Sequence, residues 1–488
     1  MASTKSPPAM FRDVHTAART NETIVRTSPA TGKALLPLNS RDRMWFGIAL
    51  PFNSYRAYSF ALHDCPDDVE RRLKDGLRTC LDSSAAFQFL SGRYDRKSKA
   101  VVDSNHGIPF SSLQLEHPLP EESNLDEELV WRLADLRRPR RAETGGEPLV
   151  TATLAIFSGG AAVLTVSAAH AVLDGEALIR FVGEWASCAR GAPPGGGESP
   201  AARADRATTS VPPMRVPALE RLLIPKSMNF LTGRLFTALK KLPRSATCGA
   251  LGRPCVTFSA ETLAQIKDAA SPPPPAWIST QEALAALLLL ALWRLTKTQK
   301  KPHSRAMFWL AGRRFYGGEH GAPADPAANY LVIIPVDVKR ETLEQGVRAV
   351  ATRLHDGLAE FGPKDAAEQH ALYDAADGCV SAGIKMMKDK FKPPADCACE
   401  MKLNNLSKLS LQSFGADGAA ASSAFAWTMA GPTAVLADGK GGVRIFLQKG
   451  DDLPKGVTAS QLKSELEASW PLNLGSACQD GIELTRLV

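Results

Sequence analysis

The sequence of 488 residues lacks an apolar segment long enough to cross a membrane. Its longest apolar run, residues 283–293 (ALAALLLLALW), has 11 residues, whereas a helix that spans a bilayer needs roughly 20. We therefore expect no membrane span and assign this run to a buried helix. The sequence also has no GxSxG nucleophile elbow, no glycine-rich phosphate loop ending in Lys-Ser or Lys-Thr, and no HExxH zinc helix. These absences argue against the enzyme classes that depend on such motifs.

Cysteines are few and irregularly placed. There are nine in the chain, an odd number without regular spacing, which favours reduced, mostly packed thiols in a cytoplasmic protein over a disulfide framework. Cys397 and Cys399 are separated by one residue, but no second pair follows at the spacing of zinc ligands. We interpret them as structural and predict no metal site.

The balance of charge is unremarkable for a protein of this length. The formal net charge is +7, and Lys and Arg alternate with Asp and Glu instead of clustering beside aromatic residues, which argues against a nucleic-acid partner. A solvated surface explains the basic surplus, although a phosphate-bearing cofactor would fit it as well.

The length predicts two or three domains. Residues 1–35 have no secretory apolar core and are expected to form a flexible leader; an organelle transit peptide is the less favoured alternative, because Asp13 and Glu22 are unusual in one. Residues 36–190 alternate β-branched runs with helix-period stretches, which indicates a first α/β domain. Residues 191–250 begin with a segment rich in Gly, Pro, Ser and Ala and are interpreted as a crossover linker. Residues 251–488 form the second domain.

Several elements are readable from local patterns. Amphipathic or capped helices are predicted at 69–82, 258–270 and 278–294, the latter two with Ser259 and with Ser279 or Thr280 as N-caps. Strands rich in β-branched residues are predicted at 330–338 and 442–448.

The most informative stretch covers residues 161–186 (AAVLTVSAAHAVLDGEALIRFVGEWA). It predicts a strand, a turn that carries His170, and a helix whose apolar residues recur at spacings of three and four. A neutral imidazole, with an ordinary pKa of about 6.5, can take a proton from an attacking hydroxyl or amine and return it to a leaving group. Asp174 is expected at the helix start, where it would pair with a cation and fix the turn, and Gly175 would permit close packing. The spacing alone also fits a packed turn histidine.

The segment HAVLDG at 170–175 resembles the HxxxDG motif that follows a strand in the BAHD acyltransferases of plants and fungi, a family with the chloramphenicol-acetyltransferase-like fold. Other segments similar to the family's own occur in the same order, and the resemblance spans about residues 36–450. They are LPLNSRDR at 36–43, FLSGRY at 89–94, GIPF at 107–110, the helices at 258–270 and 278–294, and AGRR at 311–314, which stands where the family usually has DxRxR.

The resemblance implies an α/β protein with two chloramphenicol-acetyltransferase-like domains, each a mixed sheet with flanking helices, joined by a long crossover. It implies transfer of an acyl group from acyl-CoA, the co-substrate, to a hydroxyl or amine of a small-molecule acceptor of specialised metabolism. His170 would be the general base in a ternary complex, without an acyl-enzyme. No permanently bound cofactor or metal and no nucleic acid is expected, and the enzyme would be a cytoplasmic monomer.

The resemblance also implies roles for further residues. Arg313 would be the cation opposite Asp174, although Ala311 replaces the family's Asp in that motif. Ser279 and Thr280 match positions near the coenzyme A tunnel, with simple helix capping as the equal alternative.

The family's DFGWG motif appears as SFGAD at 413–417, which keeps only Phe414 and Gly415 as structural support. The oxyanion donor is therefore left open. Trp427 offers an indole N–H nearby in sequence, but a packed core tryptophan is the favoured interpretation.

Related proteins are distinguished by position and neighbours. Peptide-forming condensation domains have a second histidine immediately before the first, where this chain has Ala169. Dihydrolipoamide acyltransferases and chloramphenicol acetyltransferase are short, trimeric proteins that carry the motif near the C-terminus. In this chain the motif lies in the first half, with a second domain after it. An alternative function is a catalytically altered acyl-CoA binding or sensing protein of the same fold.

Overall fold

The computed structural model describes the sheets, the helices and the turns that join many of them. The described residues are 21–26, 34–37, 53–61, 64–119 apart from 85, 96, 99 and 105, 133, 148–193 apart from 171, 255–315 apart from 297, 331–375, 390–407, 414, 422–427, 433–438, 441–447, 457–469 and 482–485. Among them, no helix is both long and apolar enough to cross a bilayer.

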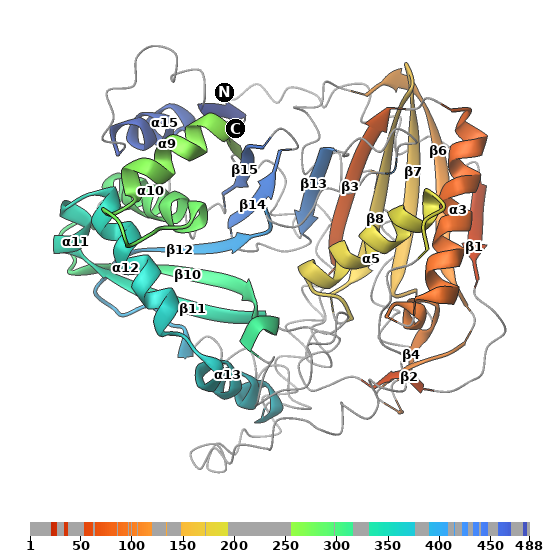
Figure 1. Ribbon diagram of the computed structural model, residues 1–488, viewed down its shortest axis with the longest axis horizontal. Coiled ribbons are helices and arrows are strands. Elements are labelled where there is room, and N and C mark those ends of the chain that lie inside the picture. Colours follow the sequence, from red (N-terminus) through yellow and green to blue (C-terminus); the bar gives the residue numbers. More distant parts are fainter. Residues whose placement is uncertain are drawn as a thin grey trace, which may run out of the picture.

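The first sheet has six strands in the order β1-β6-β7-β8-β3-β13. They are β1 (Asn21–Val25), β6 (Ile108–Pro118), β7 (Val150–Ser158), β8 (Ala161–Ala169), β3 (Asn53–Ala61) and β13 (Ser422–Trp427). Only the β6–β7 pair is parallel; the other neighbours are antiparallel. Two helices pack together beside this sheet, α3 (Pro66–Ser83) and α5 (Gly175–Ala189) (Figure 1).

The second sheet has seven strands in the order β11-β10-β12-β14-β15-β9-β16. They are β11 (Leu331–Lys339), β10 (His303–Ala311), β12 (Cys397–Asn405), β14 (Thr433–Ala437), β15 (Val443–Phe446), β9 (Cys255–Phe258) and β16 (Ile482–Thr485). Its helices are α9 (Ala260–Ala270), α10 (Thr280–Leu295), α11 (Arg340–Glu344), α12 (Val347–Glu360), α13 (Pro363–Ala375) and α15 (Ala459–Ala468). A small third sheet joins β2 (Ala34–Pro37), β5 (Ala100–Val102) and β4 (Arg93–Asp95), next to the 3-10 helix η1 (Gln88–Ser91).

Helix α10 is the apolar run that the sequence assigns to a core helix. Every residue from Glu282 to Trp293 is buried, and each fully buried Leu contributes about 1.5–3 kcal/mol relative to an exposed one. The helix begins with a capping box: the Ser279 hydroxyl accepts from the Glu282 backbone N–H, and the Glu282 carboxylate accepts from the Ser279 N–H. The predicted capped helix at 278–294 is confirmed.

Helices α3 and α5 cross at very close range. A Cβ placed on Gly76 of α3 would lie 2.5 Å from the Ala189 backbone of α5, so only glycine fits there without a shift. The indole N–H of Trp185 donates to the Leu73 carbonyl across the same interface, at 2.8 Å. The two helices thus pack closely as one layer of the first core.

Two boundaries expected from the sequence are wrong. The leader predicted over residues 1–35 is not flexible throughout, because Asn21–Val25 pairs with β6 as the edge strand β1. Ser422–Trp427, assigned to the second domain, forms β13 of the first sheet by pairing with β3, and Figure 1 shows it between β14 and β3. Most of the predicted crossover, from residue 194 to the end of the linker, lies outside the described residues.

Candidate functional site

His170 occupies the turn between β8 and α5. The residue before it, Ala169, is held from several sides: its N–H donates to Leu149 O at 2.8 Å, and its carbonyl accepts from the N–H groups of Val172 and Leu173 at 3.0 and 3.3 Å. His170 is only 4% exposed. The predicted arrangement of strand, turn and helix is confirmed, and the turn that carries the histidine is fixed by backbone hydrogen bonds.

Asp174 is the N-cap of α5. Its Oδ1 accepts a hydrogen bond from the Ala177 N–H at 2.9 Å, and the residue is buried. A carboxylate in this position also interacts favourably with the positive end of the helix dipole. Arg313 belongs to the 3-10 helix η4 (Gly312–Phe315), which follows β10, but its side chain lies outside the described part of the molecule. The pairing of Asp174 with Arg313 therefore stays a prediction.

The second half of the chain reaches the motif at Gly175. A Cβ on Gly175 would lie 3.4 Å from Cδ2 of Leu406, a residue that follows β12 and whose N–H donates to Val435 O of β14 at 2.9 Å. The first residue of α5 thus lies close to a segment anchored to the second sheet.

Phe414, from the second half of the sequence, lies in the core of the first sheet. Its ring is fully buried and makes edge-to-face contacts with Tyr58 of β3 and Trp185 of α5, with centroids 5.5 and 5.7 Å apart. This position fits the structural role predicted for the phenylalanine of SFGAD. Gly415, its predicted companion, lies outside the described residues.

Trp427 is the last residue of β13. Its backbone pairs with Ser54 of β3, and Ser54 pairs in turn with Ala168 of β8. The tryptophan backbone therefore lies at the same end of the first sheet as His170, two strands away. The indole is not among the described side chains, so the oxyanion donor stays an open question.

Ser279 and Thr280 lie where α10 begins, in the second half of the chain. The Ser279 hydroxyl is engaged in the capping box, and the Glu282 carboxylate that completes it also lies 3.2 Å from Nδ1 of His355. Ser279 therefore caps the helix, as one of the two alternatives predicts. The negative charge of Glu282 reduces the attraction of this helix end for an anion. Thr280 is exposed.

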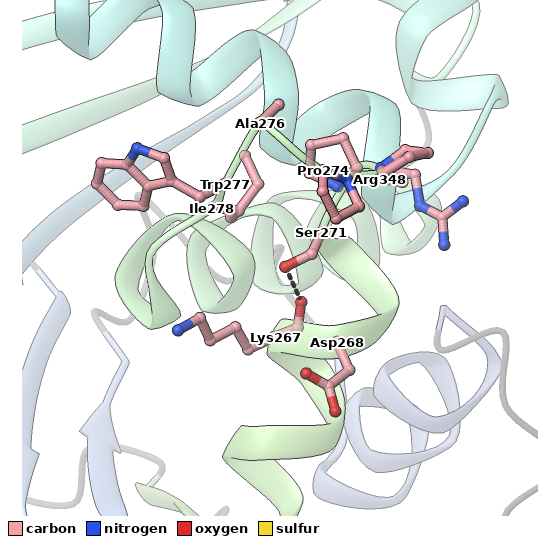
Figure 2. A pocket seen from close by; sticks show the side chains of 10 residues that line it. Lys267, Asp268, Ser271, Pro274, Ala276, Trp277, Ile278 and Arg348 are labelled. Carbon is pink, nitrogen blue, oxygen red and sulfur yellow. Dashed lines mark hydrogen bonds between the residues drawn. The ribbon is translucent and has the colours of Figure 1, made fainter.

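A pocket of about 450 Å³ lies beside the loop that leads into α10. Figure 2 shows its lining, which combines the loop with one side chain of α12 and the end of α9. Trp277 is 63% exposed, and the centroid of its ring lies 5.1 Å from that of the His355 ring. The lining residues are Lys267, Asp268, Ser271, Pro272, Pro273, Pro274, Ala276, Trp277, Ile278 and Arg348.

Cys397 and Cys399 make local contacts in the second sheet. The Cys397 thiol donates to the Cys399 carbonyl at 3.1 Å, and the Cys399 thiol lies 3.4 Å from the Ser304 hydroxyl. Burial is the main cause that raises the pKa of Cys397 to about 11, so this thiol is protonated and unreactive at neutral pH.

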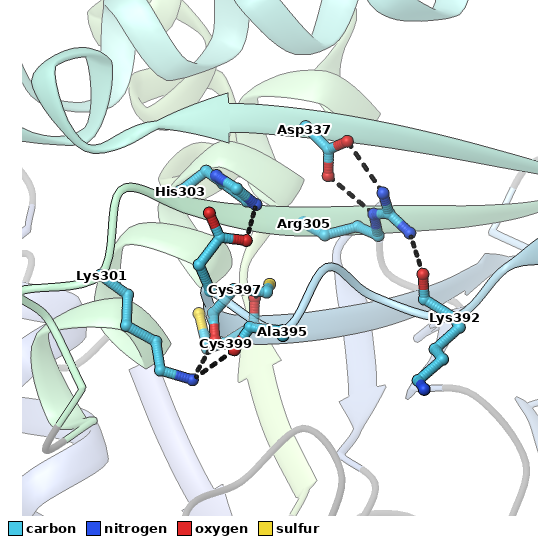
Figure 3. Close-up of polar contacts among 9 residues, drawn as sticks. Lys301, His303, Arg305, Asp337, Lys392, Ala395, Cys397 and Cys399 are labelled. Atoms are coloured by element: carbon cyan, nitrogen blue, oxygen red, sulfur yellow. Dashed lines mark hydrogen bonds and ion pairs between the residues drawn. The ribbon is translucent and has the colours of Figure 1, made fainter.

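A polar network surrounds these two cysteines (Figure 3). Arg305 forms a bidentate pair with Asp337 at 2.7 and 2.8 Å, which ties β10 to β11, and Lys301 donates to the Cys397 carbonyl at 3.0 Å. Within the described ranges, no group of three or more His, Cys, Asp or Glu residues is arranged to hold a metal ion. The arrangement is that of a structural cluster.

Sequence reasoning missed Leu406 near Gly175 and Tyr58 as a contact of Phe414. Neither residue carries a motif, and each is brought to its position by segments far apart in the sequence. An apolar residue after a strand, such as Leu406, gives no local signal that it will pack on a particular helix.

The comparisons with known proteins agree with this geometry. Residues 15–223 match the model of the Transferase family. No curated protein sequence matches the chain significantly.

Three solved structures illustrate the fold. Vinorine synthase is similar with a TM-score of 0.61 at 15% identity, over 90% of this chain and 97% of that one. TRI101 of F. graminearum, in complex with coenzyme A and T-2 mycotoxin, has a TM-score of 0.59 at 14% identity, over 92% and 99%. Polyketide synthase associated protein 5 from Mycobacterium tuberculosis has a TM-score of 0.51 at 13% identity, over 90% and 98%. The predicted chloramphenicol-acetyltransferase-like α/β fold is confirmed.

Proposed function

We propose that this chain transfers an acyl group from acyl-CoA to a hydroxyl or amine of a small molecule, because residues 15–223 match the model of the Transferase family and the fold is similar to that of vinorine synthase. The observation that carries the proposal is the position of His170. It lies in a turn fixed by backbone hydrogen bonds, directly before a helix whose first residue lies close to Leu406 of the second half of the chain.

In the proposed reaction, His170 is the general base. Its imidazole takes the proton of the acceptor hydroxyl or amine as that atom attacks the thioester carbonyl, and then delivers a proton to the departing thiolate. Both substrates are bound together, so the acyl group passes directly from sulfur to oxygen or nitrogen. Holding the two reactants in position supplies up to about 7–11 kcal/mol of the barrier reduction.

In this proposal, Asp174 is a positioning residue that fixes the conformation of the turn carrying His170. The hydrogen bond to Ala177 and the burial of the carboxylate support that role, because a cap fixes where the helix begins and so where the preceding residues point. Pairing with Arg313 would add a link to the second half of the chain.

We propose that coenzyme A enters beside the N-terminus of α10. The pocket next to this helix offers features that suit a phosphorylated nucleotide: the cations of Lys267 and Arg348, and the exposed ring of Trp277. Ammonium and guanidinium groups bind phosphates, and an indole stacks on a purine. TRI101, which shares the fold, is known in complex with coenzyme A. Thr280 is the exposed hydroxyl nearest in sequence to this loop.

The proposal extends to the cellular setting. We propose that the enzyme works as a monomer in the cytoplasm and that its acceptor is a specialised metabolite. TRI101, which has a similar fold, is known in complex with coenzyme A and the small molecule T-2 mycotoxin, which supports a small-molecule acceptor. Size-exclusion chromatography with light scattering tests the first statement, and imaging of the tagged protein tests the second.

The test of the function is release of free thiol. Purified protein is incubated with acetyl-, malonyl- and aromatic acyl-CoA and a pool of alcohols and amines. His170→Ala is expected to lower the rate by about 100-fold or more. His106→Ala, which changes an exposed histidine of the same half, serves as the matched control and keeps the wild-type rate.

Equal release by the wild type and by His170→Ala across the whole panel would contradict the enzyme proposal. Binding of acyl-CoA without turnover would then favour the acyl-CoA binding or sensing protein. An acylated side chain found by mass spectrometry would contradict the ternary-complex route.

A further inference from the structure

Two buried thiols face each other where α3 and α5 cross. Cys80 of α3 is fully buried, and Cys188 of α5 is 7% exposed. Both belong to the core cluster of the first sheet, and each thiol is the largest influence on the pKa of the other. The proposed acyl transfer uses neither of them.

The geometry of the crossing suits a covalent link. Gly76 and Ala189 bring the two helix backbones into direct contact; Cys80 lies one turn beyond Gly76 on α3, and Cys188 immediately precedes Ala189 on α5. A disulfide requires Cα atoms about 4.4–6.8 Å apart, so the proposal depends on a close helix crossing of this kind. The Trp185–Leu73 hydrogen bond fixes the two helices in the same relative position.

We propose that Cys80 and Cys188 form a redox-active pair that a small peroxide converts into a disulfide linking α3 to α5. Under reducing conditions the two are free thiols, as in the present structure. The proposal is independent of acyl transfer, so it stands or falls separately.

Cys188 is the attacking member of the pair. Its interaction with Cys80 is the main cause that lowers the pKa of Cys188, and the same interaction is the main cause that raises the pKa of Cys80. Cys188 is also nearer the surface, since the exposed Arg190 and Gly191 follow it at the end of the helix. The more easily ionised thiol is the better nucleophile at neutral pH.

The reaction has two steps. The Cys188 sulfur attacks one oxygen of hydrogen peroxide, the O–O bond breaks, and the leaving hydroxide takes a proton to become water, which leaves a sulfenic acid on Cys188. The Cys80 sulfur then attacks the Cys188 sulfur, the S–S bond forms, and the sulfenic oxygen leaves as a second water with the thiol proton. Two thiols are oxidised, and one peroxide is reduced to two waters.

The experiment is peptide mapping of the folded, full-length protein after treatment with hydrogen peroxide. Trypsin cleaves after Arg78, Arg93, Arg180 and Arg190, so the link joins peptide 79–93 to peptide 181–190. We expect this linked pair in the wild type, its loss on reduction, and two free thiols fewer than the nine of the reduced chain.

Three variants sharpen the test. Cys80→Ser is expected to stop at the sulfenic acid, which a cyclic 1,3-diketone traps on Cys188. Cys188→Ser is expected to leave Cys80 unmodified. Cys65→Ser, which removes an exposed cysteine at the N-cap of the same helix α3, is the matched control and retains the link.

The wild-type map decides the outcome even if a serine variant fails to fold. Oxidation of Cys65 without the 79–93 to 181–190 link, in protein whose circular dichroism is native, would overturn the proposal. So would trapping of the sulfenic acid on Cys80 in place of Cys188.

Discussion

Asp174 lies four residues after His170, and its carboxylate accepts a hydrogen bond of 2.9 Å from the backbone N–H of Ala177. This bond begins α5 and fixes the end of the turn that carries the imidazole. The expected role of Asp174 as a carboxylate at a helix start is therefore consistent with a concrete contact.

Asp174→Ala is expected to lower the free energy of unfolding by about 1–2 kcal/mol, because one N–H of the first turn loses its acceptor. Asp174→Asn keeps a side-chain oxygen and is expected to lose less than half of that. Urea denaturation of the two variants measures the difference. Equal destabilisation by Ala and Asn would show that the negative charge, and not the cap, is what the fold requires.

The predicted partnership with Arg313 is tested by a double-mutant cycle. If the two charges lie within reach, Asp174→Asn and Arg313→Gln are expected to reduce thiol release to a similar extent, and the double variant is expected to lose little more than either. The coupling should exceed about 0.5 kcal/mol. Additive effects of the two changes would contradict the proposed ion pair between Asp174 and Arg313.

Much of the fold was readable from local signals, and the reason is physical. Helix periodicity and caps are properties of neighbouring residues, so α5 with Asp174 and α10 with Ser279 lie where the sequence predicts them. The same holds for the turn at His170, since β-branched residues end where the helix pattern begins.

The contacts between the halves were not readable. The pairing of β13 with β3 joins strands from opposite ends of the chain, and a strand's partner is set by tertiary packing and not by its own composition. The contact of Leu406 with Gly175 is equally invisible locally. Site residues that belong to a single strand, turn or helix were therefore predicted. Residues that reach the site only because distant segments pack together were not.

Phe414 is expected to stabilise the core of the first sheet. Phe414→Ala removes a fully buried ring between Tyr58 and Trp185, and a loss of about 3–5 kcal/mol is typical of such a cavity. Phe414→Leu retains most of the volume and is expected to cost less. Chemical denaturation measures both, and Ile24→Ala, at an exposed apolar position, is the neutral control. A Phe414→Ala variant as stable as this control would contradict the packing described.

Trp277 is expected to act in binding acyl-CoA and not in chemistry. Trp277→Ala removes the exposed ring beside the pocket, and loss of a base stacked on an aromatic ring costs about 1–3 kcal/mol. KM for acyl-CoA is therefore expected to rise at least several-fold with little change in kcat. Ile24→Ala again serves as the control, because it removes the other large exposed apolar side chain among the described residues. An unchanged KM would remove this pocket from the proposed coenzyme site.

Cys397 predicts a dependence of stability on alkaline pH. Its pKa is raised from 9.0 to about 11 in the folded protein, chiefly by burial, so the folded state holds its proton at pH values where the unfolded state has released it. Stability from this group is present below pH 9 and is lost as the pH rises toward 11. The loss is at most about 3 kcal/mol, and less because the thiol is only partly buried.

Lys and Tyr also titrate in this range, so the informative quantity is the difference between the wild type and Cys397→Ser, whose hydroxyl does not ionise there. The wild type is expected to lose more stability between pH 9 and 11, as measured by urea denaturation at each pH. Parallel curves for the two proteins would show that the Cys397 thiol titrates with the same pKa in the folded and unfolded chains.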